Sequence, residues 1–585
     1  MYYDFKKRID FRKKRPDRKN SEIRGENIRL ITIGGFEEVG NNLYALEYKD
    51  NIWIFDMGFQ FVSEDEFPGV SFTLPNIKYL EERKHKIKGV IITHGHLDHI
   101  GGMPYLMKRL DYPLVYTREL TSYLIKKRME ETRQVNSVKM KIVEPGDQLM
   151  IGDFSFEFFN VTHSIPNSMG VIVKTHYGNL IFTGDLKLSH ENGQPLPYEV
   201  KNWGRISEME NLLMIADSTN CEQEGWSIQE RDIEKNIERI IRNAPGRVVI
   251  ATFASQFERV FSFIRIAEQL GKKVILEGRS ILTNLEIAQE AKYFEPKPGT
   301  IIPAKDVDKY PADRILVIST GGQGEEFAAL PRMARKEHPY IKLNSRDTVI
   351  LSSSVIPGNE IAVRGLLDDL ARNNCSVITY KHEEVHSTGH ANAEELAWII
   401  RQVHPKYFVP GYGFHSMLKA HKRIAVEKAG IKEENVIVPE NGNIIEIRSK
   451  DDVRILKEKT PNLPLVVDGK SISILPKAVL DDRKALAHDG FINLIVLINV
   501  SKRKIQKSPD ILSRGFIYLK NNAEILNKIR EIIIEETEKA IKNSEKTNGR
   551  INVDKLKEEM SSKVSRYISR KTGKRPIIMP VILVV

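Results

Sequence analysis

Three histidines and an aspartate are concentrated in one short stretch, THGHLDHIGG at residues 93–102. The apolar run at residues 90–92 predicts a buried strand before it, and apolar residues at helical spacing follow up to residue 110. The cluster therefore falls between a strand end and a helix start, where α/β folds place their chemistry. Two pairs of ligands in one loop can hold two cations about 3.5–4 Å apart, as in two-metal hydrolases. A polar, solvated loop is the alternative.

Two further ligand types follow predicted strands. His163 lies in NVTHSIPNS and Asp185 in LIFTGDLK. An isolated histidine is more often structural, and an aspartate after glycine more often forms a turn. Because the chain already carries the first cluster, we expect both to be metal ligands. Asp56, which closes NIWIFDMG, is either an acceptor for a metal-bound histidine or a simple strand-end aspartate.

The composition indicates the class of protein. The 585 residues are 41% hydrophobic and 29% charged, as in soluble globular chains of roughly two to four domains. No apolar run reaches about 18 residues and no secretory signal is evident, so we expect a cytoplasmic protein without a membrane span. Cys221 and Cys375 are the only cysteines, which excludes a disulfide framework and a thiolate metal cage. The formal charge of +11 favours a polyanionic partner.

The motifs THGHLDHIGG, VTHSIP and FTGDLK, in that order, resemble the metallo-β-lactamase fold. The resemblance implies an α/β fold, an αββα sandwich of two sheets beneath outer helices, with two metal sites that share a carboxylate. The implied ligands are His94, His96 and His163 for one ion, Asp98 and His99 for the other, and Asp185 bridging both. Such ligands suit two divalent ions, for which we expect Zn²⁺, with Mn²⁺ as the alternative and Mg²⁺ as an activator.

Later segments resemble the ribonuclease J family. LLMIADSTNCEQEGWS is similar to the acidic motif that opens a β-CASP insertion, with Asp217 as its carboxylate. STGGQGEEFAALPRMA, VILSSSVIPGNE, SPDILSRGF and KTGKRPIIMPVILVV are similar to further segments of that family. The resemblance covers nearly the whole chain after residue 26. It implies an inserted β-CASP α/β domain and a small C-terminal α+β domain that supports a homodimer or homotetramer.

These features give the expected domain boundaries. We expect a basic flexible arm at 1–26, the metallo-β-lactamase domain at 27–218 and 376–448, the β-CASP domain at 219–375, a linker at 449–470, and the C-terminal domain at 471–585.

The segment HSTGHAN resembles the H-x-S-G-H motif of the family. By that resemblance His390 is the general acid that protonates the leaving 3′ oxygen, and Asp217 orients it. The substrate-binding candidates are the loop residues His386, Ser387, Thr388 and Gly389, which would hold a phosphate, and more weakly Ser255, Gln256 and Phe257.

One motif departs from the family. The usual P-x-H-G, whose histidine completes the second metal site, is replaced by a sequence that places Tyr412 at the aligned position. A phenol with a pKa near 10 is a poor ligand unless a cation ionises it. Three outcomes are open: a weaker second site completed by water, Tyr412 bound as phenolate, or His415 as the ligand. We favour the first, because the other ligands are retained.

Together the motifs predict a metal-dependent ribonuclease. It would hydrolyse RNA to 5′-phosphate and 3′-hydroxyl ends, as a 5′-to-3′ exonuclease, an endonuclease or both, in rRNA processing and mRNA decay. Single-stranded RNA would lie in a basic groove, held by backbone charge and stacking. Two alternatives are another hydrolase on the same fold, acting on a thioester or lactone, and a non-catalytic RNA-binding subunit, suggested by Tyr412.

Overall fold

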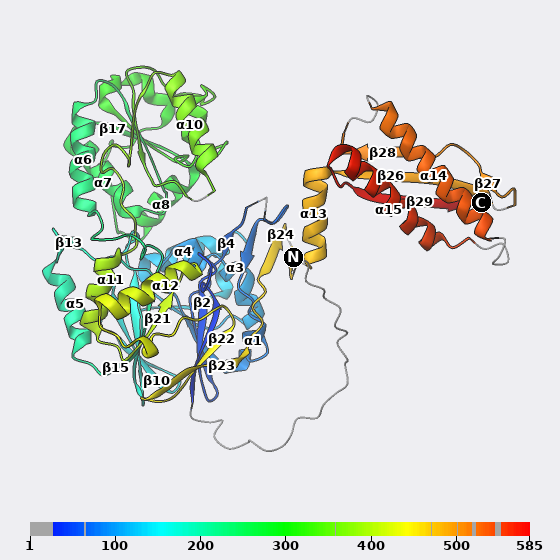
Figure 1. Cartoon of the computed structure of the whole chain (residues 1–585). Coiled ribbons are helices and arrows are strands. Elements are labelled where there is room, and N and C mark those ends of the chain that lie inside the picture. Colours follow the sequence, from blue (N-terminus) through cyan, green and yellow to red (C-terminus); the bar gives the residue numbers. More distant parts are fainter. Residues whose placement is uncertain are drawn as a thin grey trace, which may run out of the picture. The chain divides into compact units, whose positions relative to one another are not determined.

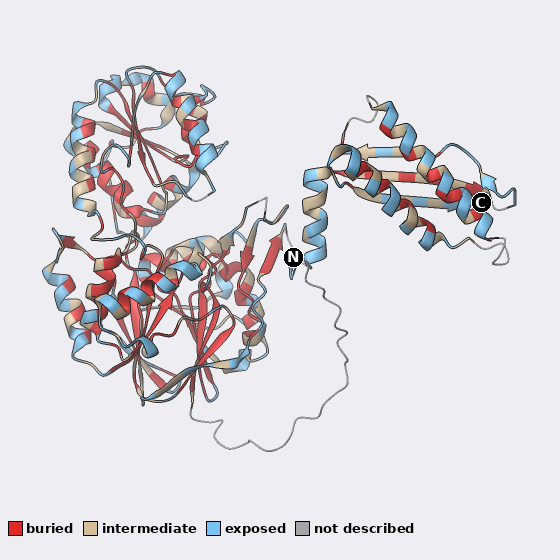
Figure 2. Cartoon of the chain, viewed as in Figure 1, coloured by how far each residue is buried: buried red, intermediate tan, exposed pale blue. Residues whose placement is uncertain are grey.

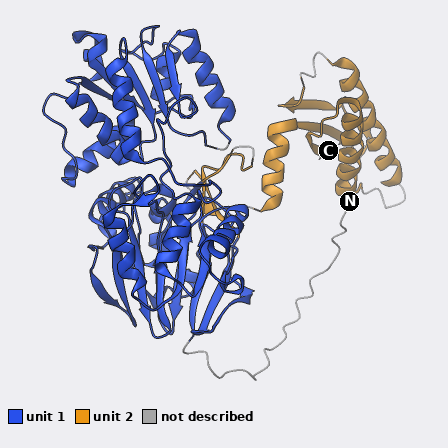
Figure 3. Ribbon diagram, turned by 60° about the vertical axis from the view of Figure 1, so that its left-hand side comes forward, with its two compact units in different colours: residues 1–60, 75–462 blue, residues 61–74, 463–585 orange. Residues whose placement is uncertain are grey.

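The computed structural model describes residues 27–63, 66–356, 358–469, 471–474, 476–499, 501–517, 522–544 and 551–585. The expected arm at 1–26 lies outside these residues. The chain divides into two compact units, residues 1–60 with 75–462 and residues 61–74 with 463–585 (Figure 3). Among the described helices, none has the length and apolar character needed to cross a bilayer.

Two sheets pack face to face in the larger unit (Figure 1). The first has the order β23-β22-β1-β2-β3-β6-β7-β8 and the second β21-β15-β12-β11-β10-β9. The first sheet comprises β1 (Ile28–Gly34), β2 (Leu43–Tyr48), β3 (Asn51–Phe55), β6 (Ile87–Ile91), β7 (Val115–Thr117), β8 (Met140–Ile142), β22 (Asn443–Ser449) and β23 (Asp452–Lys459). The second comprises β9 (Gln148–Ile151), β10 (Phe154–Asn160), β11 (Met169–Thr175), β12 (Gly178–Phe182), β15 (Asn211–Asp217) and β21 (Tyr407–Gly411).

Aromatic side chains fill the space between these sheets. Phe55 on β3 stacks on Phe182 on β12 with ring centroids 4.3 Å apart, and Tyr44 on β2 lies 5.4 Å from the same ring. All three are fully buried, and the strands form the buried centre of this unit (Figure 2). The outer face of the second sheet packs against α5 (Pro197–Ser207), α11 (Ala393–Val403) and α12 (His415–Arg423). This arrangement confirms the expected αββα sandwich, whose core fixes the strand ends that carry the site.

The inserted domain is a parallel sheet with helices on both faces. Its order is β17-β18-β16-β19-β20, and every neighbouring pair is parallel. The strands are β16 (Val248–Thr252), β17 (Lys273–Glu277), β18 (Ile315–Ser319), β19 (Thr348–Ser352) and β20 (Ser376–Thr379). The helices are α6 (Glu230–Asn243), α7 (Phe257–Gln269), α8 (Arg279–Glu290), α9 (Ala329–Ala334) and α10 (Glu360–Arg372). The sheet is buried on both faces, which explains its continuous runs of valine, isoleucine and leucine.

The segment 449–470, expected to be a linker, contains strands. β23 pairs with β22 at the edge of the first sheet, and β24 (Leu465–Asp468) pairs with β5 (Phe72–Leu74). Half of the side chains of β23 are both exposed and charged, as is common for an edge strand, where charge opposes pairing with another molecule. The charged composition of this segment predicted a linker where the structure has the strand β23. In addition, β20 lies just beyond residue 375, the expected end of the inserted domain.

The smaller unit is an α+β domain, as expected. Its sheet joins β26 (Phe491–Asn499) to β27 (Lys504–Ile505), β28 (Asp510–Arg514) and, in parallel, β29 (Ile577–Val584). Alternate residues of β26 are buried against α14 (Ala523–Ser544) and α15 (Val553–Thr572). The sequence predicts α14 at 523–542, whereas α15 and α13 (Lys477–Asp489) were not anticipated.

Candidate metal centre

The predicted ligands lie at one edge of the sandwich, on loops and, for Asp98 and His99, on a short helix. β10 and β12 run in the same direction because both are antiparallel to β11, and β15 is parallel to β12. Their carboxyl ends therefore meet at one edge, where His163, Asp185 and Asp217 follow or end these strands. The histidine cluster follows β6. The helix expected up to residue 110 is divided into α2 (Leu97–Ile100), α3 (Met103–Leu106) and a 3₁₀ turn.

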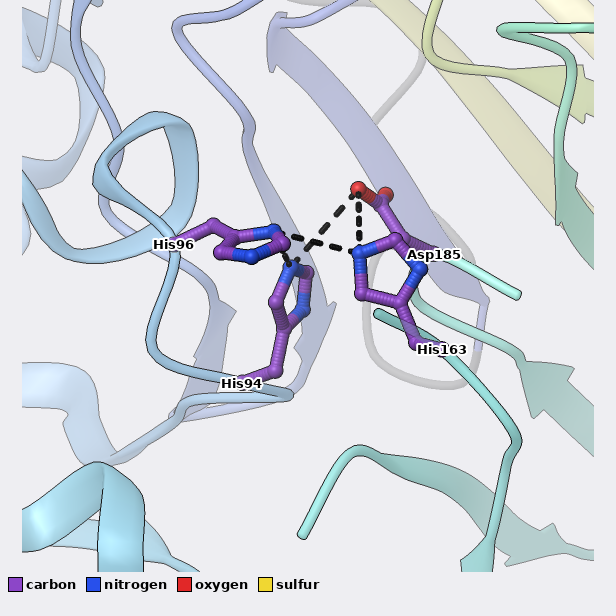
Figure 4. Close-up of side chains that lie close together, drawn as sticks. All are labelled: His94, His96, His163 and Asp185. Atoms are coloured by element: carbon purple, nitrogen blue, oxygen red, sulfur yellow. Dashed lines mark hydrogen bonds and ion pairs between the residues drawn. The ribbon is translucent and has the colours of Figure 1, made fainter. Parts of the chain in front are cut away.

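Three histidines and an aspartate converge on the first candidate metal position (Figure 4). His94 Nε2 lies 3.2 Å from His96 Nδ1, which lies 3.1 Å from His163 Nε2. Asp185 Oδ2 is 3.6 Å from His94 Nε2 and 3.8 Å from His163 Nε2. Donors held about 2.1 Å from one ion lie roughly 3.0–3.5 Å apart, so this group has the spacing of a metal site.

A second group shares the same aspartate. His99 Nε2 lies 3.4 Å from Asp98 Oδ2 and 3.2 Å from Asp185 Oδ1. Asp185 thus faces the first group with one carboxylate oxygen and the second group with the other. This is the arrangement that a bridging ligand requires.

Protein acceptors bind the outer N–H groups of these imidazoles. His163 Nδ1 lies 2.7 Å from the carbonyl oxygen of Gly389, and His99 Nδ1 lies 2.8 Å from Asp56 Oδ2. Carbonyl and carboxylate oxygens only accept, so both Nδ1 atoms carry a hydrogen, and in the neutral ring this leaves Nε2 as the atom that can bind a metal. Of the two interpretations of Asp56, the structure supports the acceptor, because its carboxylate receives the Nδ1 hydrogen of the predicted ligand His99.

The outer nitrogens of His96 and His94 also lie beside hydrogen-bond acceptors. His96 Nε2 lies 3.4 Å from the carbonyl oxygen of Ser255, and His94 Nδ1 lies 3.0 Å from the hydroxyl of Thr93. That hydroxyl donates to Asp56, so it accepts from His94. The three inner nitrogens of the first group therefore present lone pairs, which repel one another unless a cation lies between them. The residues present fit two divalent ions.

Burial and neighbouring charges keep the three imidazoles of the first group neutral. Burial, followed by the neighbouring imidazoles, holds the pKa of His94 and His163 well below the usual value. Burial also lowers the pKa of His96 to about 4, against the opposing effect of Asp98. Neutral imidazole is the form that binds metal. His99 differs: burial acts to lower its pKa, but Asp185, Asp98 and Asp56 outweigh burial and raise it.

His390 and Asp217 form a pair beside this centre. His390 Nδ1 donates to Asp217 Oδ2 over 2.6 Å, and the amide and hydroxyl of Thr219 donate to Asp217 Oδ1. His390 Nδ1 also lies 4.0 Å from Asp185 Oδ2. Burial acts to lower the pKa of His390, yet Asp217 and then Asp185 raise it to about 9. The pair therefore holds a proton next to the metal ligands.

Two buried cations hold the loop at 386–390, and the sequence reading missed both. Lys187 Nζ donates to Ser387 Oγ over 2.5 Å and to Thr388 O over 3.1 Å. Arg259 donates to His386 Nδ1 over 2.7 Å and to Ser387 O over 2.8 Å. The side chains of His386 and Ser387 are thus used within the protein. Lys187 lies two residues after Asp185 in FTGDLK, which was the one sequence signal available for it.

A cavity lies beside the first metal group. Its volume is about 410 Å³, and its lining includes His163, Thr388, Gly389, Lys187, Gln256 and Arg259. Of the weaker candidates, Ser255 is exposed next to His96, whereas Phe257 is buried against Phe261 in the core of the inserted domain. The structure therefore places Gln256, Thr388 and Gly389 at a hollow surface and Phe257 away from it.

Neither residue considered for the missing ligand points at the second group. The hydroxyl of Tyr412 donates to Tyr44 over 3.0 Å, and burial together with Tyr44 raises its pKa well above the usual value. A neutral phenol engaged elsewhere is not a phenolate ligand. His415 is exposed at the start of α12, and its Nδ1 lies 2.7 Å from Glu37.

The sandwich, the two ligand groups and the inserted parallel domain define a metallo-β-lactamase-type protein with a β-CASP insertion. Residues 38–220 match the metallo-beta-lactamase superfamily, residues 245–370 the ribonuclease J beta-CASP domain, and residues 478–585 the ribonuclease J C-terminal domain. Ribonuclease J 2 of Staphylococcus aureus strain MRSA252 is 33% identical over 560 residues, which cover 96% of this chain and 98% of that protein. The chain belongs to the ribonuclease J family.

Two further proteins are similar. Ribonuclease J 2 of Staphylococcus epidermidis is 32% identical over 560 residues, covering 96% of this chain and 98% of that protein. The crystal structure of a protein of unknown function from Enterococcus faecalis V583 has a TM-score of 0.52 and 18% identity. The match covers 72% of this chain and 100% of the other, and it shows a shared fold.

Proposed function

We propose that the protein is a metal-dependent ribonuclease that hydrolyses single-stranded RNA to products with 5′-phosphate and 3′-hydroxyl ends. The observation that carries the proposal is Asp185, which faces three imidazoles with one carboxylate oxygen and the pair Asp98 and His99 with the other. The ribonuclease J family and the names of the relatives favour RNA over a thioester or lactone.

The two groups differ in what they would bind. His94, His96 and His163 with Asp185 form a nitrogen-rich set that suits Zn²⁺. Asp98 and His99, sharing Asp185, would hold the second divalent ion. Ions bound there lower the pKa of water enough to supply hydroxide near neutral pH.

His390 would protonate the leaving 3′ oxygen. Asp217, which accepts its Nδ1 hydrogen, raises the pKa of His390 and so favours the protonated imidazole. Asp217 accepts the Nδ1 hydrogen, so Nε2 is the atom left to donate to a substrate. Asp217 is itself fixed by Thr219, which keeps the imidazole in one orientation.

The cavity beside His163 would hold a nucleotide or phosphate of the RNA. About 410 Å³ lies within the range of roughly 300–1,000 Å³ for small-ligand pockets. Lys187 and Arg259 lie in its lining together with the carboxylates of Glu230, Glu234 and Glu258. Thr388 and Gly389 bring the predicted phosphate-binding loop to its wall. With it we propose cleavage from a 5′ end, internally or both, in RNA maturation and decay.

The smaller unit is our candidate for self-association. Leu512, Met579 and Leu583 on its sheet are 54%, 50% and 50% exposed. Exposed apolar side chains on one sheet favour a covering partner, and a second copy gives the predicted homodimer or homotetramer. The proposed substrates, ribosomal and messenger RNA, favour a cytoplasmic location.

One assay tests the function. Purified protein is incubated with 5′-labelled monophosphate and triphosphate RNA, with and without chelator, and with a thioester substrate in parallel. We expect Mn²⁺- or Zn²⁺-dependent RNA products with 5′ phosphates and none from His96→Ala. Turnover of the thioester alone would replace the proposal with another hydrolase, and RNA binding without turnover would replace it with a binding subunit.

A further inference from the structure

Asn42 lies beside the second ligand group, which consists of Asp98, His99 and Asp185. No sequence motif indicated this residue. The residue is 2% exposed, in the connection between β1 and β2. Its backbone N–H donates to Asp98 O over 3.1 Å, and its carbonyl oxygen accepts from Gly58 N over 3.0 Å. These two bonds fix Asn42 beside the loop that carries Asp98 and His99.

The side-chain amide of Asn42 points into the second group. Nδ2 lies 3.2 Å from Asp98 Oδ2 and 2.9 Å from His99 Nε2. His99 Nε2 in turn lies 3.4 Å from Asp98 Oδ2 and 3.2 Å from Asp185 Oδ1. Ligand atoms about 2.1 Å from one ion are roughly 3.0–3.4 Å apart, so the amide atom has the spacing of a fourth ligand.

The other end of the same amide is unsatisfied. Within the described part of the chain, no hydrogen-bond donor reaches Oδ1 of Asn42, although that atom is buried. A buried acceptor without a donor costs about 1–3 kcal/mol, and such groups often mark an ion. Rotating the amide by half a turn exchanges its oxygen and nitrogen, which have nearly the same shape. The oxygen then faces the ligand group.

We infer that Asn42 supplies its amide oxygen as a ligand to the second divalent ion, in place of the imidazole that Tyr412 replaces. The inference rests on the proposed two-metal function. In the metal-loaded protein an N–H directed at a cation is repelled, whereas an amide oxygen is attracted. Tyr412 and His415 do not compete, because their polar atoms engage Tyr44 and Glu37.

This assignment makes the two metal positions chemically different. The second set becomes three oxygens and one nitrogen, from Asn42, Asp98, Asp185 and His99, and oxygen-rich sets favour Mn²⁺ or Mg²⁺ over Zn²⁺. The first set has three imidazoles and favours Zn²⁺. We therefore expect one zinc ion and one more weakly bound manganese ion per chain.

Metal titration of the full-length protein tests the assignment. Zinc is loaded to one equivalent, Mn²⁺ is added, and free Mn²⁺ is counted by its electron paramagnetic resonance signal. We expect Asn42→Ala to weaken Mn²⁺ binding at least tenfold and Asn42→Asp to equal or exceed the wild type, since a carboxylate is the stronger ligand. Retention of the single zinc ion by each variant reports an intact first site.

Asn211→Ala is the matched control, because Asn211 is another buried amide, and its Nδ2 donates to the backbone carbonyls of Ile206 and Val403, away from both ligand groups. It should leave Mn²⁺ affinity unchanged. Unchanged Mn²⁺ affinity in Asn42→Ala would overturn the assignment. So would equal weakening by Asn42→Ala and Asn42→Asp, because that result would mean that Asn42 only donates a hydrogen bond to Asp98.

The inference and the function fail separately. If the wild type binds Mn²⁺ through Asn42 and cuts no RNA, the proposed function is wrong and the ligand assignment stands. If the wild type cuts RNA and Asn42→Ala binds both ions normally, the ligand assignment is wrong and the function stands.

Discussion

His163 Nδ1 donates a hydrogen bond to the carbonyl oxygen of Gly389 over 2.7 Å, across 226 positions of sequence. The third imidazole of the first metal group is thereby oriented by the loop that carries His390. Metal binding and the candidate general acid thus depend on the same piece of backbone.

Gly389→Ala should disturb both metal binding by His163 and the position of His390. A Cβ at this position would lie 2.7 Å from Ser164 Oγ and 3.0 Å from His163 Cε1, which is too close without movement. Loss of an outer contact to a ligand histidine typically costs about 10–100-fold in metal affinity or activity, and we expect that range. Zinc content and RNA cleavage measure it. Gly204→Ala, where a Cβ meets no atom within 4 Å, is the control; an equal effect of both variants would contradict the explanation.

Asp56→Asn should weaken the second metal selectively. Asp56 accepts from His99 Nδ1 and from the amide and hydroxyl of Thr93. An asparagine fits the left-handed backbone at this position (φ 57°) but has a single acceptor oxygen for these donors. We expect roughly a 10–100-fold loss of Mn²⁺ affinity, read by calorimetry. Asp50→Asn, whose side chain is 90% exposed, should change nothing. Equal Mn²⁺ affinity in Asp56→Asn and the wild type would refute this role.

His390→Gln should slow chemistry without removing metal. General acid catalysis typically contributes about 10²–10⁴-fold, so the single-turnover rate on RNA should fall in that range. Asp217→Asn should act in the same direction, because Asp217 holds Nδ1 of His390. The metal content of His390→Gln, measured by mass spectrometry, should equal that of the wild type. His382→Gln is the control: His382 is exposed, and the variant should cleave RNA at the wild-type rate. Loss of a metal ion on His390→Gln would instead make His390 a ligand.

His386 should make the protein sensitive to acid. Burial, and then Arg259, lower its pKa from 6.5 to about 3. The unfolded chain therefore takes up a proton below pH 6.5 that the folded protein refuses until about pH 3, so stability is lost as pH falls through this window. At pH 5 the loss relative to pH 7.5 is about 2 kcal/mol from this one group.

His386→Asn isolates that effect. Its side chain offers Arg259 an acceptor and does not titrate. Urea unfolding of chelator-treated protein at pH 7.5 and pH 5 should show a drop in the free energy of unfolding smaller by about 2 kcal/mol in the variant. Identical drops in the variant and the wild type would show that His386 is protonated at no cost in the folded protein.

The sequence alone indicated most of the metal centre and the layers that carry it. Ligands such as His94, His96 and Asp98 are close in sequence and follow an apolar strand, so local spacing was enough to predict their convergence. His163 and Asp185 were recognisable because each follows a strand in the same way. The resemblance of the motifs to a known family implied the sandwich and the inserted α/β domain, whereas the spacing of apolar residues predicted α14.

The tertiary structure alone decided which groups complete and hold the site. Asn42 and Arg259 reach it from segments without a motif, and the motif FTGDLK did not reveal the role of Lys187. A buried amide or cation is placed by packing and hydrogen bonding between elements distant in sequence. The segment predicted as a linker contains β23 for a similar reason. Its partner β22 supplies the backbone hydrogen bonds, and such pairing is not evident from the composition of a charged edge strand.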